Sequence, residues 1–221
     1  EIMKQKEEIE RTYQNVKLLS EIGQEITANL TIEAIVEKVY EKVNTLMDAV
    51  IFGIGIFDEI NQTVTLKVME EGVTHNSVYD LLDADRPAIW CFKDKKEIIS
   101  NDWKKDYANY FSIKSKPKIG KSSSSLVYLP LVFQNTKILG VITIQSYSKN
   151  AYSEYQINIL RNLGAHTAIA LENARLYAHM EEEVKERTTE IIKQNEEIEK
   201  TYTNIKLISE IGQQITSTLD L

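Results

Sequence analysis

The chain has 221 residues, of which 43% are hydrophobic and 27% are charged, and its net charge is −7. This hydrophobic content is enough to build a globular core, which excludes a disordered protein. The acidic balance argues against binding to nucleic acids or anionic membranes, because such surfaces repel an acidic protein at long range.

The first and last segments of the chain are two copies of one sequence. Residues 1–32 return as residues 190–221, and 21 of the 32 aligned pairs are identical. The repetition indicates that one structural role is kept in both copies. The second copy stops at the point where the first enters the central part of the chain. We therefore expect the parent protein to continue into another similar domain, as a tandem array.

Both copies carry an apolar residue at every seventh position. These residues are Ile2, Ile9 and Val16 in the first copy, and Val184, Ile191, Ile198 and Ile205 in and just before the second. Sevenfold spacing with charged flanks predicts a coiled-coil helix and a parallel homodimer. The other core position is held by Arg187, Gln194 and Thr201, which pack poorly, so we expect a marginal helix pair that can change its packing. A solvated single helix that spaces domains is the alternative.

Between the two copies, the hydrophobic pattern predicts an α+β domain. Residues 31–47 have the periodicity of an amphipathic helix, with Thr31 as its N-cap. Two hairpins follow, formed by residues 50–57 with 63–69 and by residues 126–133 with 137–147, and then a long apolar helix over 155–177. We therefore expect a largely antiparallel sheet that is covered by helices.

Residues 77–125 show less regular patterning, with a helical tendency near 87–92 and a short strand at 97–100. Long segments on a rigid sheet commonly carry function. This one is rich in aromatic residues: Trp90, Trp103, Tyr107, Tyr110 and Phe111. They either wall a pocket against the sheet or act as ordinary core and surface aromatics.

Several stretches resemble the C-terminal half of a bacterial GAF domain. They are LVYLPLV at 126–132, ILGVITIQS at 138–146, Tyr152-Ser153, and AIALENARLY at 168–177, together with an upstream IISND at 98–102. The resemblance covers roughly residues 16–177. It implies a six-stranded antiparallel sheet with helices on both faces, in which the terminal helices often dimerise and a small-ligand pocket lies on the opposite face.

On this basis we divide the chain into three parts. Residues 1–15 are an N-terminal coiled-coil linker helix, residues 16–177 the GAF-like domain, and residues 178–221 a linker helix that enters the next repeat. In the family such domains commonly sit upstream of histidine kinases, nucleotide cyclases or serine phosphatases and adjust their output. None of those catalytic motifs occurs here.

The sequence matches motifs of enzymes and cofactor-binding proteins only in part or not at all. Residues 115–122 match a phosphate-binding loop except at the first glycine, but a strand rather than a helix follows them. The asparagine, lysine, phenylalanine and acidic signature of cyclic-nucleotide-binding relatives cannot be placed on this chain. Cys91 has no adjacent histidine, as bilin attachment would require, and a single cysteine cannot complete the disulfide chemistry of methionine sulfoxide reduction. We expect Cys91 to be a buried apolar residue.

We also expect no metal site and no resident cofactor. The three histidines, His75, His166 and His179, are far apart in sequence, and nothing brings them together. The absence of internal disulfides is consistent with a reducing compartment, so we expect a cytoplasmic protein. No apolar run approaches the roughly 20 residues that cross a bilayer, and we expect no membrane insertion.

The sequence therefore predicts a non-catalytic sensory domain that binds a small molecule and signals through a dimeric helical linker to neighbouring domains. The alternative is a structural dimerisation or spacer module without a ligand. We predict five ligand-binding residues, of which Asp102 and Tyr128 are chosen because a few polar groups orient a ligand in an apolar pocket. They are Trp90, Asp102, Trp103, Tyr107 and Tyr128. The ligand itself is not identified.

Overall fold

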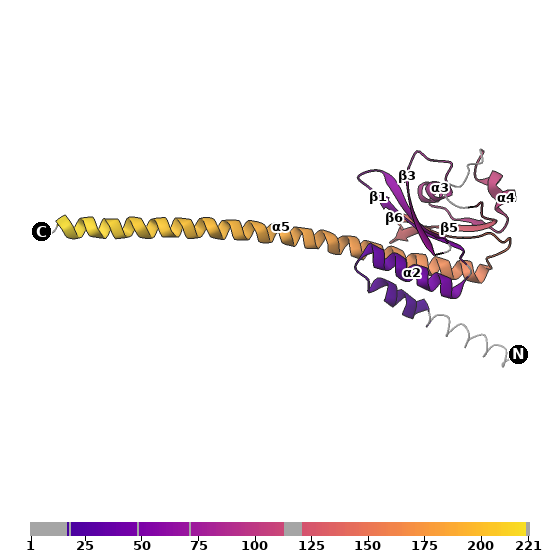
Figure 1. Ribbon diagram of the computed structural model, residues 1–221, viewed down its shortest axis with the longest axis horizontal. Coiled ribbons are helices and arrows are strands. Elements are labelled where there is room, and N and C mark those ends of the chain that lie inside the picture. The colour runs from indigo at the N-terminus through magenta and orange to yellow at the C-terminus, as the bar shows by residue number, and fades with distance from the viewer. Residues whose placement is uncertain (1–16, 18, 48, 71, 113–120, 220–221) are drawn as a thin grey trace. The chain divides into compact units, whose positions relative to one another are not determined.

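The computed structural model of the chain describes residues 17, 19–47, 49–70, 72–112 and 121–219 (Figure 1). The chain falls into two compact units, Glu1–Ala174 and Arg175–Leu221. The predicted coiled-coil positions Ile2, Ile9 and Val16 lie outside the described residues, as does most of the loop at 115–122.

The first unit is built on one six-stranded antiparallel sheet with the strand order β3-β2-β1-β6-β5-β4. The strands are β1 (Ile51–Asp58), β2 (Thr63–Glu70), β3 (Val73–Asp80), β4 (Ile98–Ser100), β5 (Ser125–Phe133) and β6 (Lys137–Ser146). This confirms both predicted hairpins and the six-stranded antiparallel fold. The hairpins β1–β2 and β5–β6 meet through the pairing of β1 with β6, which places hydrophobic strands at the centre of the sheet.

Strand β3 lies in a segment that the sequence pattern left unassigned. Its residues VTHNSVYD are mostly exposed or half-buried, and only Tyr79 is buried. An edge strand pairs on one side alone and is poorly covered, so it lacks the hydrophobic alternation that identifies a strand in a sequence. Strand β3 is defined instead by its backbone pairing with β2, which runs from the pair Thr63 and Asp80 to the pair Glu70 and Val73.

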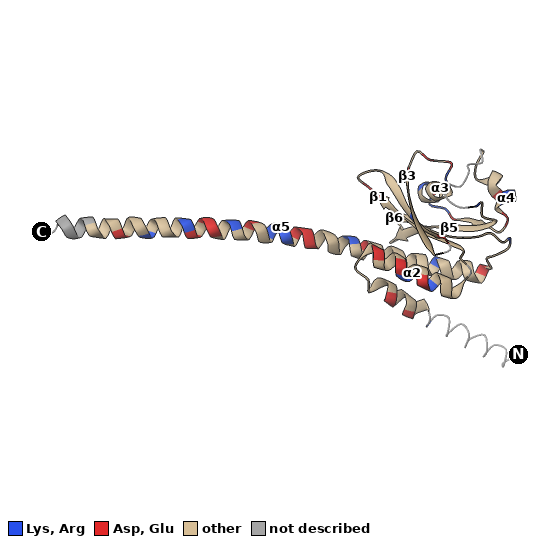
Figure 2. Ribbon diagram, viewed as in Figure 1, with Lys and Arg blue, Asp and Glu red and all other residues tan. Residues whose placement is uncertain are grey.

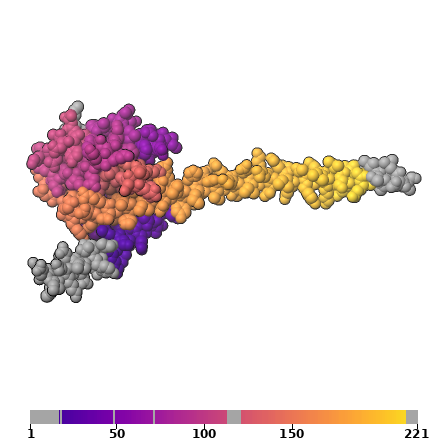
Figure 3. Space-filling view, turned by 180° about the vertical axis from the view of Figure 1, so that it is seen from behind, coloured from indigo at the N-terminus to yellow at the C-terminus, as the bar shows by residue number. Residues whose placement is uncertain are grey.

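One face of the sheet is covered by three helical segments. They are residues 19–27, α2 (Ile32–Leu46) and the first turns of α5 (Glu154–Leu219). Figures 1 and 3 show α2 and α5 side by side over this face. Thr31 is the N-cap of α2, as predicted, and its Oγ1 accepts a hydrogen bond from the backbone N–H of Ala34 at 3.4 Å. Alternate residues of the central strands and the apolar stripes of the helices form the larger core here.

The opposite face carries shorter helices: α3 (Pro87–Asp94), α4 (Trp103–Asp106) and the 3₁₀ turn η1 (Tyr107–Asn109). Helix α3 begins with a proline, which suits a first turn that leaves its N–H unpaired, and Lys95 ends it in the left-handed conformation (φ 57°). We call this side of the sheet the distal face. The second hydrophobic core lies between it and these helices.

The terminal strand β4 is joined to the start of α5 by Asn101. Its Nδ2 donates to the carbonyl of Tyr152 (2.9 Å) and its Oδ1 accepts from the N–H of Tyr152 (3.2 Å). Ser125 adds a second connection, because its Oγ donates to the carbonyls of Asn101 and Ser148. These bonds fix the end of β4 and the beginning of α4, from which Trp103 extends.

Helix α5 begins with a capping box, in which Ser153 and Gln156 bond each other's backbone N–H groups. The helix predicted over 155–177 and the linker predicted beyond it form one helix of 66 residues. Every residue from 175 to 214 is exposed. Figure 2 shows acidic and basic residues intermixed along this part of α5, as expected for the flanks of a coiled-coil helix.

Candidate functional site

The distal face has a floor that the strand register defines. Gly53 in β1 pairs with Thr143 in β6, which pairs with Tyr128 in β5, and Tyr128 pairs with Ile98 in β4. Side chains along a strand alternate between faces, so all four positions of this row face the same side of the sheet. A Cβ on Gly53 would lie 3.0 Å from Thr143 Cγ2, so the missing side chain gives Thr143 the room it occupies.

A chain of polar side chains runs along this floor. Ser123 Oγ donates to Gln145 Oε1 (2.6 Å), and Gln145 Nε2 donates to Tyr128 Oη (2.9 Å) and lies 3.5 Å from Thr143 Oγ1. Thr143 and Tyr128 are buried, whereas Ser123 and Gln145 are half-buried. We call Ser123, Tyr128, Thr143 and Gln145 the polar row. A mostly apolar site with a few such groups has the composition of a small-molecule site.

Burial sets the charge state of the polar row. Desolvation raises the pKa of the Tyr128 hydroxyl well above its ordinary value, because an apolar surrounding disfavours the phenolate. Tyr128 therefore stays neutral throughout the physiological pH range. As a neutral hydroxyl it both accepts and donates hydrogen bonds, which suits recognition of a polar ligand group.

Aromatic residues from α3, α4 and η1 cover the distal face. The ring of Trp103 contacts those of Tyr107 (centroids 5.2 Å apart) and Tyr110 (5.8 Å). Tyr110 in turn meets Trp90 edge-to-face at 5.3 Å, and Phe111 packs on Tyr107 at 5.2 Å. Edge-to-face and tilted pairs at these distances are favourable packing arrangements. We call these five residues the aromatic cover.

The structure brings four of the five predicted ligand-binding residues into one assembly. Trp103, Tyr107 and Tyr128 belong to the distal core, and Trp90 packs against it. Asp102 is the N-cap residue of α4, where its Oδ2 accepts a hydrogen bond from Lys149 Nζ at 2.7 Å and its buried Oδ1 has no hydrogen-bond partner among the described residues. That hydrogen bond lowers the pKa of Asp102 below its ordinary value, so the carboxylate is ionised and already paired.

Sequence reasoning missed the rest of the polar row. Thr143 and Gln145 alternate with Ile142 and Ile144 in an otherwise apolar strand. That alternation was the available signal, because it places both polar side chains on one face. Their partnership with Tyr128 depends on the register of β5 against β6, which the sequence does not show.

The site offers little for catalysis. Burial raises the pKa of the Cys91 thiol, which disfavours the thiolate and makes it a poor nucleophile at neutral pH. Among the described residues, no three His, Cys, Asp or Glu side chains gather closely enough to hold a metal ion. The groups of the polar row and the aromatic cover are hydroxyls, an amide and aromatic rings.

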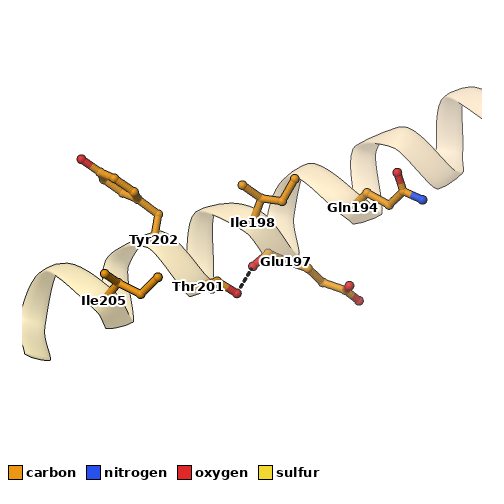
Figure 4. A pocket seen from close by; sticks show the side chains of 6 residues that line it. All are labelled: Gln194, Glu197, Ile198, Thr201, Tyr202 and Ile205. Atoms are coloured by element: carbon orange, nitrogen blue, oxygen red, sulfur yellow. Dashed lines mark hydrogen bonds between the residues drawn. The ribbon is translucent and has the colours of Figure 1, made fainter.

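A shallow hollow lies along the exposed part of α5. It is lined by Gln194, Glu197, Ile198, Thr201, Tyr202 and Ile205 (Figure 4). Ile198 and Tyr202 project from one side of the helix, whereas Thr201 donates a hydrogen bond to the backbone carbonyl of Glu197. All six residues come from one helix. The hollow is therefore an exposed strip along one helix and not an enclosed binding site.

Within the described residues, no helix combines the length and apolar character that crossing a membrane requires.

Similar solved structures share this fold. The GAF domain of an Acinetobacter phosphoenolpyruvate-protein phosphotransferase is 18% identical (TM-score 0.59) and matches over 75% of this chain and 98% of its own. The GAF domain of a Bacillus halodurans two-component sensor histidine kinase is 19% identical (TM-score 0.52), with 68% and 99% covered. A free methionine-R-sulfoxide reductase from Neisseria meningitidis is 12% identical (TM-score 0.55), with 72% and 89% covered.

The search of curated proteins returned no similar protein. The family model described as GAF domain matches residues 29–172, which include α2, all six strands and the start of α5. The chain belongs to the GAF domain family.

Proposed function

We propose that this chain is a sensory and regulatory module that binds a small molecule on the distal face and signals through a dimeric helical linker to neighbouring domains. GAF domains are in general sensory, small-molecule-binding domains of signalling proteins, and their fold is in general regulatory rather than catalytic. The polar row is the observation that carries the proposal for this chain. An amide and three hydroxyls are hydrogen-bonded in a row that joins the aromatic core through Tyr128, where a purely structural core would favour apolar side chains.

The ligand class follows from the chemistry of the polar row and its cover. Tyr128 is held neutral, and no charged side chain belongs to the row. A ligand that reaches these groups meets hydrogen-bond donors and acceptors, with aromatic faces above it. We therefore propose an uncharged or weakly polar planar molecule, of which Trp90, Trp103 and Tyr107 contact the ring and Tyr128 the polar edge. Asp102 stays a predicted ligand-binding residue, although its Oδ2 already pairs with Lys149.

The exposed stripe of α5 supports the dimeric linker. Val184, Ile191, Ile198 and Ile205 are 57–64% exposed and seven residues apart. Apolar side chains at this spacing are covered when a second helix packs alongside in parallel. Arg187, Gln194 and Thr201 at the alternate core position weaken that packing. A ligand shifts such an equilibrium by its differential affinity for the two packings.

Ligand binding is tested by thermal unfolding of the chain across a panel of nucleobases, indoles, purines and amino acids. A binder raises Tm in a concentration-dependent way. Gln145→Ala and Tyr128→Phe abolish that shift, whereas Ser122→Ala, an exposed serine beside the polar row, leaves it unchanged. A panel without any shift contradicts sensing at this face. The same shift in all variants contradicts the polar row as its site.

Dimerisation is tested by sedimentation equilibrium of the full chain at micromolar concentrations. The unaltered chain forms a dimer, and Ile191→Asn with Ile198→Asn makes it monomeric. Glu183→Gln, an exposed change on the same helix, serves as control and keeps the dimer. A chain that stays monomeric at high micromolar concentration removes the basis for signalling through paired helices.

A second function, a structural spacer and dimerisation module without a ligand, has its own supporting observation. The aromatic cover is closely packed, and Trp103, Tyr107 and Phe111 are each less than a tenth exposed. Side chains of the domain therefore already occupy much of the distal face. The ligand panel separates the two functions, because a spacer shows no shift yet still dimerises.

A further inference from the structure

The two copies of the repeated sequence have different surroundings in the same molecule. Residues 17–27 and 206–216 are identical at nine of eleven positions, and only Leu19/Ile208 and Glu25/Gln214 differ. In the first copy Ile22 is 3% exposed and belongs to the larger core of the domain. Its counterpart Ile211 is 55% exposed. An apolar helix face that is buried by a domain in one copy is thus presented to solvent in the other.

The covered copy shows what this face binds. Gly23 lies against the imidazole of His166 on α5, and a Cβ at position 23 would come within 2.5 Å of the ring. On α2, Lys38 and Lys42 pair with Glu25 at 3.2 and 2.8 Å. Helix 19–27 therefore packs on α2 and on the start of α5 of its own GAF domain. We call this location the helix-packing site.

Gly212, the counterpart of Gly23 in the second copy, interrupts the sevenfold apolar series Val184, Ile191, Ile198 and Ile205, which we call the dimer stripe. Continuing the sevenfold series from Ile205 leads to residue 212, which is a glycine and supplies no side chain to a coiled-coil core. Ile208 continues the alternate core position of Arg187, Gln194 and Thr201, whereas Ile211 lies outside both heptad core positions; the two side chains are 70% and 55% exposed. A glycine destabilises a helix relative to alanine, and in the first copy the close approach of His166 explains its presence.

We propose that residues 206–216 form the packing helix of a second GAF-fold domain. That domain covers Ile208, Ile211 and Gly212 as the domain of this chain covers Leu19, Ile22 and Gly23, with a large side chain of its own terminal helix over Gly212 in place of His166. Gln214 replaces Glu25, so the ion pairs that Glu25 makes with Lys38 and Lys42 are not open to the second copy. The inference names the partner of the linker in the proposed function, but it depends on no ligand and its test uses none.

The first test asks whether the second copy fits a GAF helix-packing site in cis. The double variant Leu19→Ile, Glu25→Gln gives residues 17–27 the sequence of 206–216. It is expected to unfold cooperatively with Tm lowered by less than about 4 °C. Loss of cooperative unfolding overturns the proposal, because the duplicated sequence then cannot occupy such a site.

The second test asks whether the second copy, as a separate peptide, binds the helix-packing site of the domain. Gly23→Leu in the full chain displaces the domain's own helix by collision with His166 and lowers Tm. A peptide of residues 190–221 is expected to restore several degrees of Tm at saturation, and the same peptide with Gly212→Leu to restore none. If Gly23→Leu prevents folding, Ile22→Ala serves as the recipient. Failure of the unaltered peptide to restore Tm, or equal restoration by both peptides, overturns the proposal.

One further outcome assigns the face to another occupant. If the unaltered chain self-associates and Gly212→Leu alone abolishes that association, a second copy of the chain covers Ile211 and the proposal is wrong. If Gly212→Leu leaves self-association unchanged, the face is separate from the dimer stripe, as proposed. Because these readouts are mass and Tm without added small molecules, they succeed or fail independently of sensing at the distal face.

Discussion

Two stretches of nearly the same sequence, residues 19–25 and 208–214, are both helical, yet one helps to form the core of a domain and the other is exposed. The local result is the same because helix formation depends on residues within a few positions of each other. Burial differs because it depends on a partner surface, which α2 and the start of α5 supply to the first copy. The comparison teaches that one apolar helix face is buried or exposed according to the partner surface beside it.

The largest difference between the copies is expected at the paired isoleucines. Ile22→Ala removes a side chain from a packed core and should lower the free energy of unfolding by about 3 kcal/mol. Ile211→Ala should change it by less than about 0.5 kcal/mol, because the side chain is exposed. Urea denaturation followed by tryptophan fluorescence measures both, since Trp90 and Trp103 lie in the domain. Equal effects would contradict the difference in burial.

A smaller difference is expected one turn earlier. Leu19 is half-buried against the domain core, whereas Ile208 is 70% exposed. Leu19→Ala should cost about 1.5 kcal/mol and Ile208→Ala less than about 0.5 kcal/mol in the same denaturation experiment. A loss at Leu19 as large as at Ile22 would show that the first helix is packed more deeply than its exposure indicates.

The glycines should respond with opposite signs. Alanine at position 23 places a Cβ against His166, and the overpacking of about 1–3 kcal/mol exceeds the gain in helix propensity, for a net loss of about 1 kcal/mol. At position 212 nothing beyond the adjoining residues and the helix's own backbone lies within 4 Å of the new Cβ, so alanine should stabilise the helix by about 0.5–1 kcal/mol. Circular dichroism of the two variants during heating measures both. A gain at both positions would show that His166 moves aside freely.

The smallest effect is expected at Glu25, where copy two already has glutamine. Hydrogen bonds from Lys42 and Lys38 lower the pKa of Glu25 below its ordinary value. A carboxylate whose folded pKa is lowered stabilises the fold above its unfolded pKa of about 4.3, and this stabilisation is lost as the pH falls through the folded pKa.

Glu25→Gln should therefore reduce stability slightly at pH 7 and not at low pH. Salt should shrink the difference, because the pairs are exposed. Urea titrations at pH 7 and pH 3, with Glu21→Gln as control on the same helix, check this. A difference that persists at pH 3 would assign the effect to packing rather than charge.

Much of the fold could be predicted because its signals are local. Thr31 caps α2 through a contact three residues away, and the alternation of residues 137–147 reflects strand geometry alone. Strand β3 could not be predicted, because it lacks hydrophobic alternation and is defined by its backbone pairing with β2, which is not visible in the sequence. At the candidate site, aromatic richness was visible between Trp90 and Phe111, but the polar row was not. Tyr128 and Gln145 are 17 residues apart and meet only through the register of a hairpin.

The amino-acid sequence by itself determined that two copies of one sequence flank an α+β domain, because identity between the copies, hydrophobic periodicity and capping can be read from neighbouring residues. Only the tertiary structure decided which copy is buried, that His166 lies over Gly23, and that hydroxyls and an amide align under the aromatic cover. These features depend on which surfaces meet. Surfaces meet through sheet register and helix packing, and both join residues that are far apart in the chain.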